Sequence, residues 1–293
     1  DGFGFVLKGR VNEFGYQSMT SPMTLQAFSS ALDKYGTMPL SELIQPAIEY
    51  CMKGFQVRPS VHAFWMQPAQ AGRMERTAVV KQLPAARKIY LNESEELLRV
   101  GDTLKNCDMG KLYQRIANEG TEIFYHGDVA SQIEADMQKN GGLLRKEDLA
   151  ACEPVYIEPL VGSYRGFEVA TNQLPGGGLM ILQMLNILEN FDLSMLGHNS
   201  AKFIALVVEA MKYATINKDN FMGDPNFIDV PEDKLLSKEY ATMIAEKIRS
   251  GEKANVERIN TGAPESKDTT HLVVADRSGN LINLTHSLGS SSG

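Results

Sequence analysis

Residues 268–287 read Asp268-Thr-Thr-His-Leu-Val-Val-Ala-Asp-Arg-Ser-Gly-Asn-Leu-Ile-Asn-Leu-Thr-His-Ser287, and this stretch decides the fold of the 293-residue chain. Apolar residues in His271–Asp276 and Leu281–Ser287 predict two strands. The Ser-Gly-Asn sequence between them predicts a tight turn. The preceding segment, Ile259–Lys267, is polar and contains Gly, Pro and Ser. The sequence therefore predicts a β hairpin that directly follows an irregular loop.

Thr269 stands at the junction between this loop and the first strand. A hydroxyl at such a place can attack its own preceding carbonyl by an N–O shift, and hydrolysis of the resulting ester would free the threonine α-amine. That amine could then act as the base for the hydroxyl of the same residue. Two threonines before a strand are also typical of plain β-propensity. The motif alone leaves both interpretations open.

Upstream of this hairpin, the chain is mainly a series of amphipathic helices. Within Val155–Thr171 the apolar residues recur at every second position, which predicts two short strands with turns at Gly162-Ser163 and Arg165-Gly166. This order of elements predicts an α+β fold with sheets sandwiched by helices, a layered αββα arrangement. The helices expected from apolar residues three or four positions apart are Leu25–Tyr35, Leu40–Met52 with a kink or a start at Pro46, Asp108–Asn118, Gly127–Lys139, Leu179–Glu189, Ala201–Phe221 and Ser237–Arg249.

The composition is that of a globular protein, with 43% apolar and 22% charged residues. No segment approaches the roughly 18 unbroken apolar residues of a membrane-spanning helix. The net charge is -7 and the basic residues are scattered, so no nucleic-acid-binding surface is expected. No signal peptide is visible in the given sequence, and the compartment stays open between periplasmic or extracellular and cytoplasmic.

Neither a metal nor a cofactor is expected from the sequence. The three cysteines, Cys51, Cys107 and Cys152, lie far apart and are interpreted as free, mostly buried thiols. The histidines show no ligand pattern for zinc, and His271 is given a structural role because a free threonine amine makes a histidine base unnecessary. The glycines that end in Gly177-Gly178 precede a helix without the Lys-Ser/Thr of a phosphate-binding loop. They are interpreted as sites of close packing or substrate approach.

The stretch 268–287 resembles the start of the small subunit of gamma-glutamyltransferases, in which Thr-Thr-His precedes a short strand, Asp-x-x-Gly-Asn and a second hydroxyl-rich strand. Upstream blocks resemble the large subunit of the same family in the same order, from about Thr20 onward. These blocks are Ala31–Leu40, Gln45–Ile48 leading to Gly54-Phe55, Phe124–Gly127, Met137–Leu143 with Glu147–Ala150, Tyr164–Gly166, Gly177-Gly178 before Leu185–Asp192, Glu209–Tyr213 and Gly223–Pro225.

The resemblance implies an N-terminal-nucleophile hydrolase sandwich, incomplete in this chain, with Thr269 as the nucleophile. The Asp268–Thr269 bond would be the processing site, which divides the chain into a large-subunit-like region, 1–268, and the beginning of a small-subunit-like region, 269–293. Ser287 falls where the family has a threonine whose hydroxyl contacts the nucleophile. Gly177 and Gly178 are candidate substrate contacts. The implied oxyanion donors come from family positions beyond residue 293.

The resemblance also implies the reaction and the partners. A γ-glutamyl amide such as glutathione would acylate the threonine, and water or an amino acid would accept the acyl group. The processed subunits would form a heterodimer, with a higher oligomer left open. Three features depart from the family. The first 17 residues lack its glycine-rich segment and the arginine that binds the substrate carboxylate. The sequence also stops soon after Thr269, and Gly289 stands where the family has a substrate-contacting asparagine. These departures keep two alternatives open, a small-amide hydrolase or acylase and a non-catalytic fragment.

Overall fold

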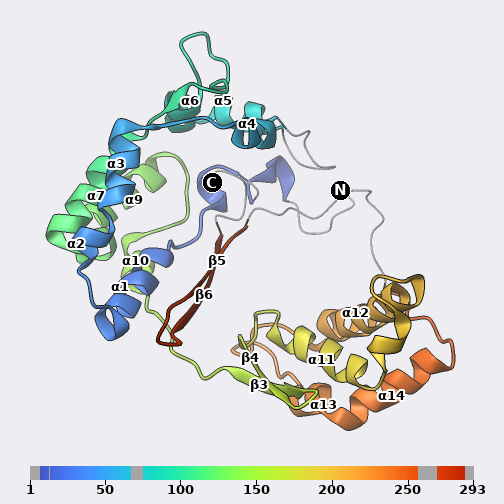
Figure 1. Ribbon diagram of the computed structural model, residues 1–293. Helices are drawn as coiled ribbons and strands as arrows, with labels where there is room; N and C mark the ends of the chain where they lie inside the picture. The colour runs from blue at the N-terminus through green and yellow to red at the C-terminus, as the bar shows by residue number, and fades with distance from the viewer. Residues whose placement is uncertain (1–6, 13, 67–74, 257–268, 288–293) are drawn as a thin grey trace. The chain divides into compact units, whose positions relative to one another are not determined.

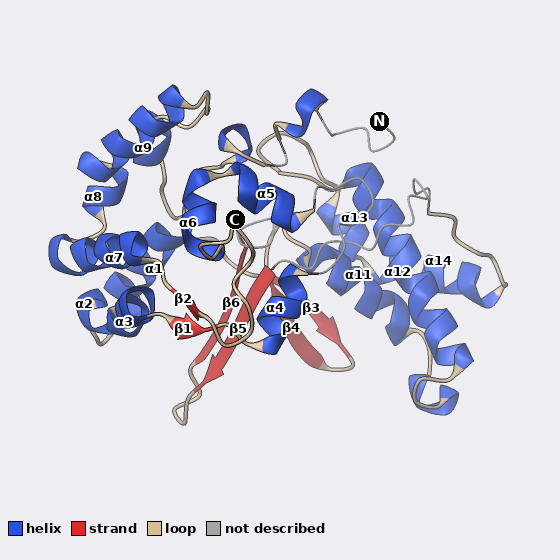
Figure 2. Ribbon diagram, turned by 90° about the horizontal axis from the view of Figure 1, so that it is seen from above, coloured by secondary structure: helices blue, strands red, loops and turns tan. Residues whose placement is uncertain are grey.

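The computed structural model describes residues 7–12, 14–66, 75–256 and 269–287, and most of its helices and strands are labelled in Figure 1. The described chain forms two compact units, one from residues 1–154 together with 259–293 and the other from residues 155–258. Helices dominate both units, and the strands pair only as antiparallel hairpins or short ladders (Figure 2). The α+β class predicted from the sequence is confirmed.

The first unit consists of short helices, two short strands and the C-terminal hairpin. Its helices are α1 (Thr24–Tyr35), α2 (Leu40–Leu43), α3 (Gln45–Lys53), α4 (Pro59–Trp65), α5 (Arg76–Gln82), α6 (Pro84–Tyr90), α7 (Cys107–Glu119), α8 (Glu122–Tyr125), α9 (Asp128–Lys139) and α10 (Lys146–Ala150). Its strands are β1 (Phe55–Gln56), β2 (Thr103–Leu104), β5 (Thr269–Ala275) and β6 (Leu281–Ser287), with β1 paired to β2 and β5 to β6.

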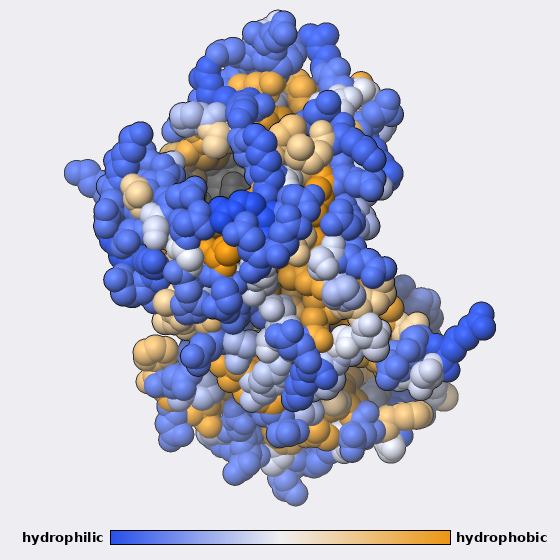
Figure 3. Space-filling model, turned by 90° about the vertical axis from the view of Figure 1, so that its left-hand side faces the viewer, coloured by the Kyte–Doolittle hydropathy of each residue, from blue (hydrophilic) through white to orange (hydrophobic). Residues whose placement is uncertain are grey.

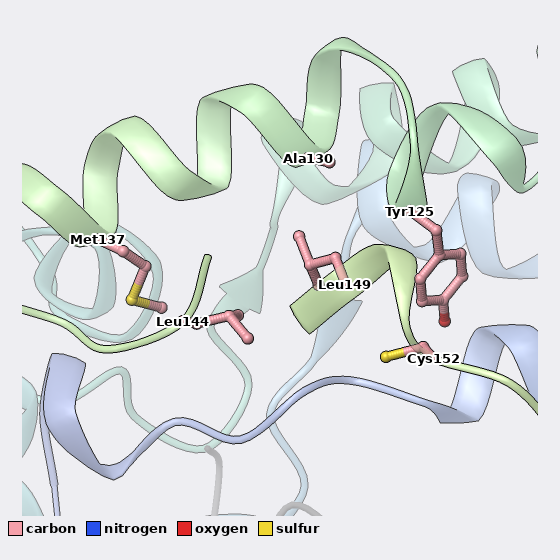
Figure 4. Packing of buried hydrophobic residues seen from close by; sticks show 6 residues of the cluster. All are labelled: Tyr125, Ala130, Met137, Leu144, Leu149 and Cys152. Carbon is pink, nitrogen blue, oxygen red and sulfur yellow. The ribbon is translucent and has the colours of Figure 1, made fainter. Parts of the chain in front are cut away.

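A buried cluster on α8, α9 and α10 is one of the two cores of this unit (Figure 4). Tyr125 and Leu149 lie in its centre, at 1% and 0% exposure. The Tyr125 hydroxyl donates to the carbonyl of Pro22 at 2.7 Å and accepts from the backbone N–H of Gln26 at 2.9 Å. The hydroxyl is therefore satisfied although the ring is buried, and it ties the start of α1 to this core. A second cluster is built on Val57, Trp65 and Leu104.

The second unit holds β3 (Leu160–Tyr164), β4 (Phe167–Thr171), α11 (Gly178–Glu189), α12 (Ala201–Phe221), α13 (Glu232–Leu236) and α14 (Lys238–Arg249). Helix α11 packs against α12, α13, α14 and β3. Its apolar residues Leu179, Leu182 and Ile187 are at most 1% exposed, so this helix lies at the centre of its own unit. Side-chain caps from Ser200 and Ser237 begin α12 and α14, because each hydroxyl accepts a hydrogen bond from a backbone N–H of the first turn.

Hydrogen bonds link several buried polar residues of the second unit. Asn217 donates to the side-chain oxygen of Gln183 at 3.2 Å and accepts from the Tyr240 hydroxyl at 3.0 Å. Glu209, whose side chain is 6% exposed, lies 2.9 Å from Lys212 Nζ and accepts from the Ala254 N–H at 3.0 Å. These contacts join α12 to α11, to α14 and to the segment that follows α14.

Two expectations from the sequence are wrong in detail. Gly162-Ser163 is not a turn but lies inside β3, paired with Val169 and Glu168 of β4. Gly162 is needed there for close packing, since a Cβ at this position would stand 2.8 Å from Leu182 Cδ2 of α11. The cysteines are free but not mostly buried: Cys152 is buried, Cys51 is half-buried and Cys107 is exposed.

The surface carries many large apolar side chains, visible as orange patches between the polar residues in Figure 3. Val155, Tyr156 and Ile157, which precede β3 and form no strand, are between 56% and 80% exposed. Within the described ranges, no helix is both long and apolar enough to cross a membrane.

Candidate active site

The hairpin β5–β6 presents the residues that the sequence singles out for chemistry. Its turn is fixed by Asp276, whose carboxylate accepts from the backbone N–H groups of Ser278 and Asn280, each at 2.9 Å, and from the Asn280 side chain at 2.8 Å. These hydrogen bonds hold the pKa of Asp276 below its usual range. Gly279 takes a φ of +85°, a conformation that glycine adopts at little cost. The tight turn predicted from the sequence is thus present.

The register set by this turn pairs Thr269 with Ser287. Thr269 is the first residue of β5 and Ser287 the last of β6, so the two positions face each other across the open end of the hairpin. Cα atoms of directly opposite residues lie about 4.5–5.5 Å apart in antiparallel strands. The structure therefore brings together the two positions named as nucleophile and hydroxyl partner. Asp268, the other half of the predicted processing site, lies outside the described residues.

The two faces of the hairpin differ in character because successive residues of a strand alternate between them. One face carries positions 269, 271, 285 and 287 and is rich in hydroxyl residues. The opposite face is mainly apolar and carries Leu272, Val274, Ile282 and Leu284. The predicted nucleophile thus belongs to the polar face.

A direct side-chain contact lies on this polar face, two cross-strand pairs further along the hairpin. The His271 Nδ1 atom and the Thr285 hydroxyl are 2.7 Å apart, and the two residues are cross-strand partners. The sequence interpretation did not single out Thr285, although period-two alternation from Thr269 and Ser287 would have placed both residues on the same face. On the other face, the ring of His286 meets Phe28 of α1 edge-on, with 6.4 Å between ring centroids.

The glycines named as candidate substrate contacts belong to the second unit, where they begin α11. Gly177 is the N-cap residue, and a Cβ at this position would meet no atom within 4 Å. Gly178 is the first residue of the helix and is buried; a Cβ there would collide with the Asn172 carbonyl oxygen and with Thr171 at the end of β4. Gly178 therefore serves close packing of α11 against β4, while Gly177 faces open space. A substrate role for either residue stays a prediction.

Potential metal ligands do not gather in the described part of the chain. His126 lies 3.6 Å from Glu122 one helical turn earlier, but no group of three or more His, Cys, Asp or Glu residues is found among the described residues.

Comparison with known proteins connects this hairpin to a family. The family model described as Gamma-glutamyltranspeptidase matches residues 5–293. The chain belongs to this family. A similar curated protein is the glutathione hydrolase proenzyme of Escherichia coli (strain K12), 40% identical over 277 residues, which are 93% of this chain and 46% of that protein. Another is the acylase ACY 1 proenzyme of Pseudomonas sp. (strain SE83), 33% identical over 96% of this chain and 49% of that protein.

The fold is also that of the family. The structure of Helicobacter pylori gamma-glutamyltranspeptidase superposes with a TM-score of 0.76 at 34% identity, covering 83% of this chain and 67% of that one. The likeness supports assignment to the N-terminal-nucleophile hydrolase fold. The chain spans about half the length of the curated relatives that it matches.

Proposed function

We propose that this chain belongs to a self-processing amide acyltransferase or hydrolase that transfers a γ-glutamyl group through an acyl-enzyme on Thr269. The donor would be glutathione or a related γ-glutamyl amide, and the acceptor water or an amino acid. The observation that carries this proposal is the pairing of Thr269 with Ser287 at the open end of the hairpin, in a chain of the gamma-glutamyltranspeptidase family.

Processing would begin with attack of the Thr269 hydroxyl on the carbonyl carbon of residue 268. The C–N bond breaks as the C–O bond forms, so the peptide becomes an ester and the threonine nitrogen becomes an amine. Water then cleaves the ester, which leaves a carboxylate on Asp268 and a free α-amine on Thr269. The products would be a large subunit that ends at Asp268 and a small subunit that starts at Thr269, associated as a heterodimer.

In turnover, the free α-amine would take the proton from the Thr269 hydroxyl as it attacks the amide carbonyl of the substrate. The tetrahedral intermediate collapses when the leaving amine receives a proton, and the acyl group remains on the threonine oxygen as an ester. Water or an amino acid then attacks this ester and releases the hydroxyl. The Ser287 hydroxyl, opposite in register, would hold the nucleophile by a hydrogen bond.

The test is the fate of the 268–269 peptide bond in the gene product that contains this chain. We expect two fragments after incubation, with Thr269 as a new N-terminus in Edman sequencing or mass spectrometry, and no cleavage in Thr269→Ala. The matched control is Thr270→Ala, which removes a hydroxyl from the adjacent residue on the opposite face and should still be cleaved. An intact wild-type chain, or equal cleavage in Thr269→Ala, would refute the proposal.

A second candidate function keeps this chemistry but changes the acyl group. Its support is the 33% identity to a relative named as an acylase, together with Gly289, which offers no side chain where the family is expected to have an asparagine. The processed protein should be offered γ-glutamyl anilide and anilides of acyl chains that lack the α-amino group. A higher kcat/KM for the latter would favour the acylase, and no turnover of any amide would favour a non-catalytic protein.

A further inference from the structure

Helices α3 and α7, which carry two of the three cysteines, pack side by side (Figure 1). Cys51 lies near the end of α3 and Cys107 is the first residue of α7. The backbone N–H of Asn106, the residue before Cys107, donates to the carbonyl of Cys51 at 3.1 Å. The chain thus brings the backbone at these two cysteines together, although 55 residues separate them in the sequence.

Gly110 shows how closely the two helices approach. A Cβ at this position would stand 3.1 Å from Cys51 Cβ and 2.7 Å from Met52 Sδ. Because Cys107 lies three residues before Gly110, both point toward the same side of α7. Cys51 therefore packs against the face of α7 that carries Cys107, and a disulfide needs Cβ atoms only about 3.5–4.5 Å apart.

The surroundings of the two thiols indicate which of them reacts first. Cys107 is exposed at the first position of a 13-residue helix, so small molecules in solution can reach its sulfur. Burial, and to a smaller degree the charge of the Cys107 thiolate, raise the pKa of the half-buried Cys51 thiol. The exposed thiol is thus the first to react, and the half-buried thiol is the second.

We propose that Cys107 and Cys51 form a thiol–disulfide exchange site for small aliphatic disulfides, with Cys107 as the attacking thiol and Cys51 as the resolving thiol. This site is separate from the hairpin and does not depend on the proposed amide chemistry.

The exchange balances in two steps. The Cys107 thiolate attacks one sulfur of the small disulfide, so that a mixed disulfide forms and the first small thiolate leaves and takes a proton from water. Cys51 then loses its proton to water and attacks the sulfur of Cys107, which releases the second small thiolate, and this thiolate takes a proton from water. The protein is oxidised by two electrons, the small disulfide is reduced to two thiols, and the new S–S bond joins the end of α3 to the start of α7.

The experiment treats the full chain with 2-hydroxyethyl disulfide, a probe without an amide that the proposed hydrolase chemistry cannot consume. After quenching and alkylation of free thiols, peptide mapping without reduction should find a peptide pair that links Cys51 to Cys107. Before alkylation, the mass of the oxidised protein should be lower than that of the untreated protein by two hydrogen atoms. Cys107 should lose its thiol at least about tenfold faster than the buried Cys152.

Variants separate the two steps. Cys51→Ser should stop the reaction at a stable hydroxyethyl adduct on Cys107, Cys107→Ser should leave Cys51 largely unmodified, and the control Cys152→Ser should behave as wild type. The wild-type measurement needs no substitution and decides the matter if a variant fails to fold. A wild-type chain that keeps the adduct on Cys107 with Cys51 still free overturns the proposal. A bond between Cys107 residues of two molecules, or a Cys107 no more reactive than Cys152, does the same.

Discussion

At the scale of single residues, the hydrogen bond between His271 and Thr285 is a side-chain contact on the face of the hairpin that carries position 269. It is 2.7 Å long and lies two cross-strand pairs away from Thr269 and Ser287, on the same face of the hairpin. The sequence interpretation gives His271 a structural role, and its bond to a cross-strand hydroxyl fits a residue that holds the two strands in register. That role stays a prediction.

Loss of this bond should weaken chemistry more than stability. In Thr285→Val the imidazole loses its partner, and we expect processing and turnover to slow by about tenfold to a hundredfold, because small shifts of a reacting group are costly. The free energy of unfolding should change by no more than about 1 kcal/mol, since the pair is exposed. First-order rates of fragment formation and chemical denaturation measure the two effects. Thr285→Ser, which keeps the hydroxyl, is the control; equal rates in Thr285→Val and wild type would contradict the prediction.

At the scale of elements, the neighbouring residues Gly177 and Gly178 differ in the space available for a side chain. Gly178→Ala puts a methyl group against the end of β4, so we expect a loss of about 1–3 kcal/mol in the free energy of unfolding. Gly177→Ala, with open space and a φ of -82°, should change it by less than about 0.5 kcal/mol. Urea denaturation followed by circular dichroism measures both variants. Two equally stable variants would show that α11 can move away from β4 at no cost.

The same contrast shows what the sequence can predict about elements. Leu25–Tyr35 and Ala201–Phe221 agree with α1 and α12 to within one residue, because the apolar periodicity of a long helix can be recognised in the sequence. The two predicted strands of the hairpin are also present. The seven-residue helices α4, α5 and α6 lie outside the predicted helices, since helices this short depend on packing rather than on their own propensity. Gly162 was predicted as a turn, but it pairs with Val169 and packs against Leu182 of α11, a contact between residues 20 positions apart that the local sequence pattern does not show.

The two proposed sites differ in how far the sequence alone could predict them. The opposition of Thr269 and Ser287 follows from the turn and from strand alternation, both of which are local and were readable. The proximity of Cys51 and Cys107 depends on how α3 packs against α7, and no local sequence pattern predicts this packing. Sequence reasoning therefore predicts the proximity of two residues that one hairpin connects, but not that of residues on separate helices far apart in the sequence.

At the scale of the whole molecule, the charges predict how stability depends on pH. Every described carboxyl group with a clear pKa shift is shifted downward. These groups are Asp108, Glu119, Asp128, Glu189, Asp192, Glu209 and Asp276. A lowered pKa in the folded state means that the unfolded chain binds more protons in acid, so the contribution to stability is present above the unfolded pKa and is lost as the pH falls through the folded one. The exposed members contribute little, because water and salt screen them.

Glu209 is the member for which we expect the largest effect, because it is nearly buried. Burial alone would raise its pKa, but hydrogen bonds from Lys212 and from the Ala254 N–H more than offset this and lower it. Glu209→Gln removes the charge but keeps an acceptor for the Ala254 N–H. We expect a loss of about 1–3 kcal/mol in the free energy of unfolding at neutral pH, the range for hydrogen bonds to a charged group.

The difference between wild type and Glu209→Gln should shrink as the pH falls through and below about 4.3, the ordinary value for glutamate, because the wild-type carboxylate is then protonated as well. Urea denaturation of both proteins at several pH values between neutral and acid measures this difference. A difference that stays constant over this range would mean that Glu209 stabilises the second unit by its shape and hydrogen bonds, and that its charge contributes nothing.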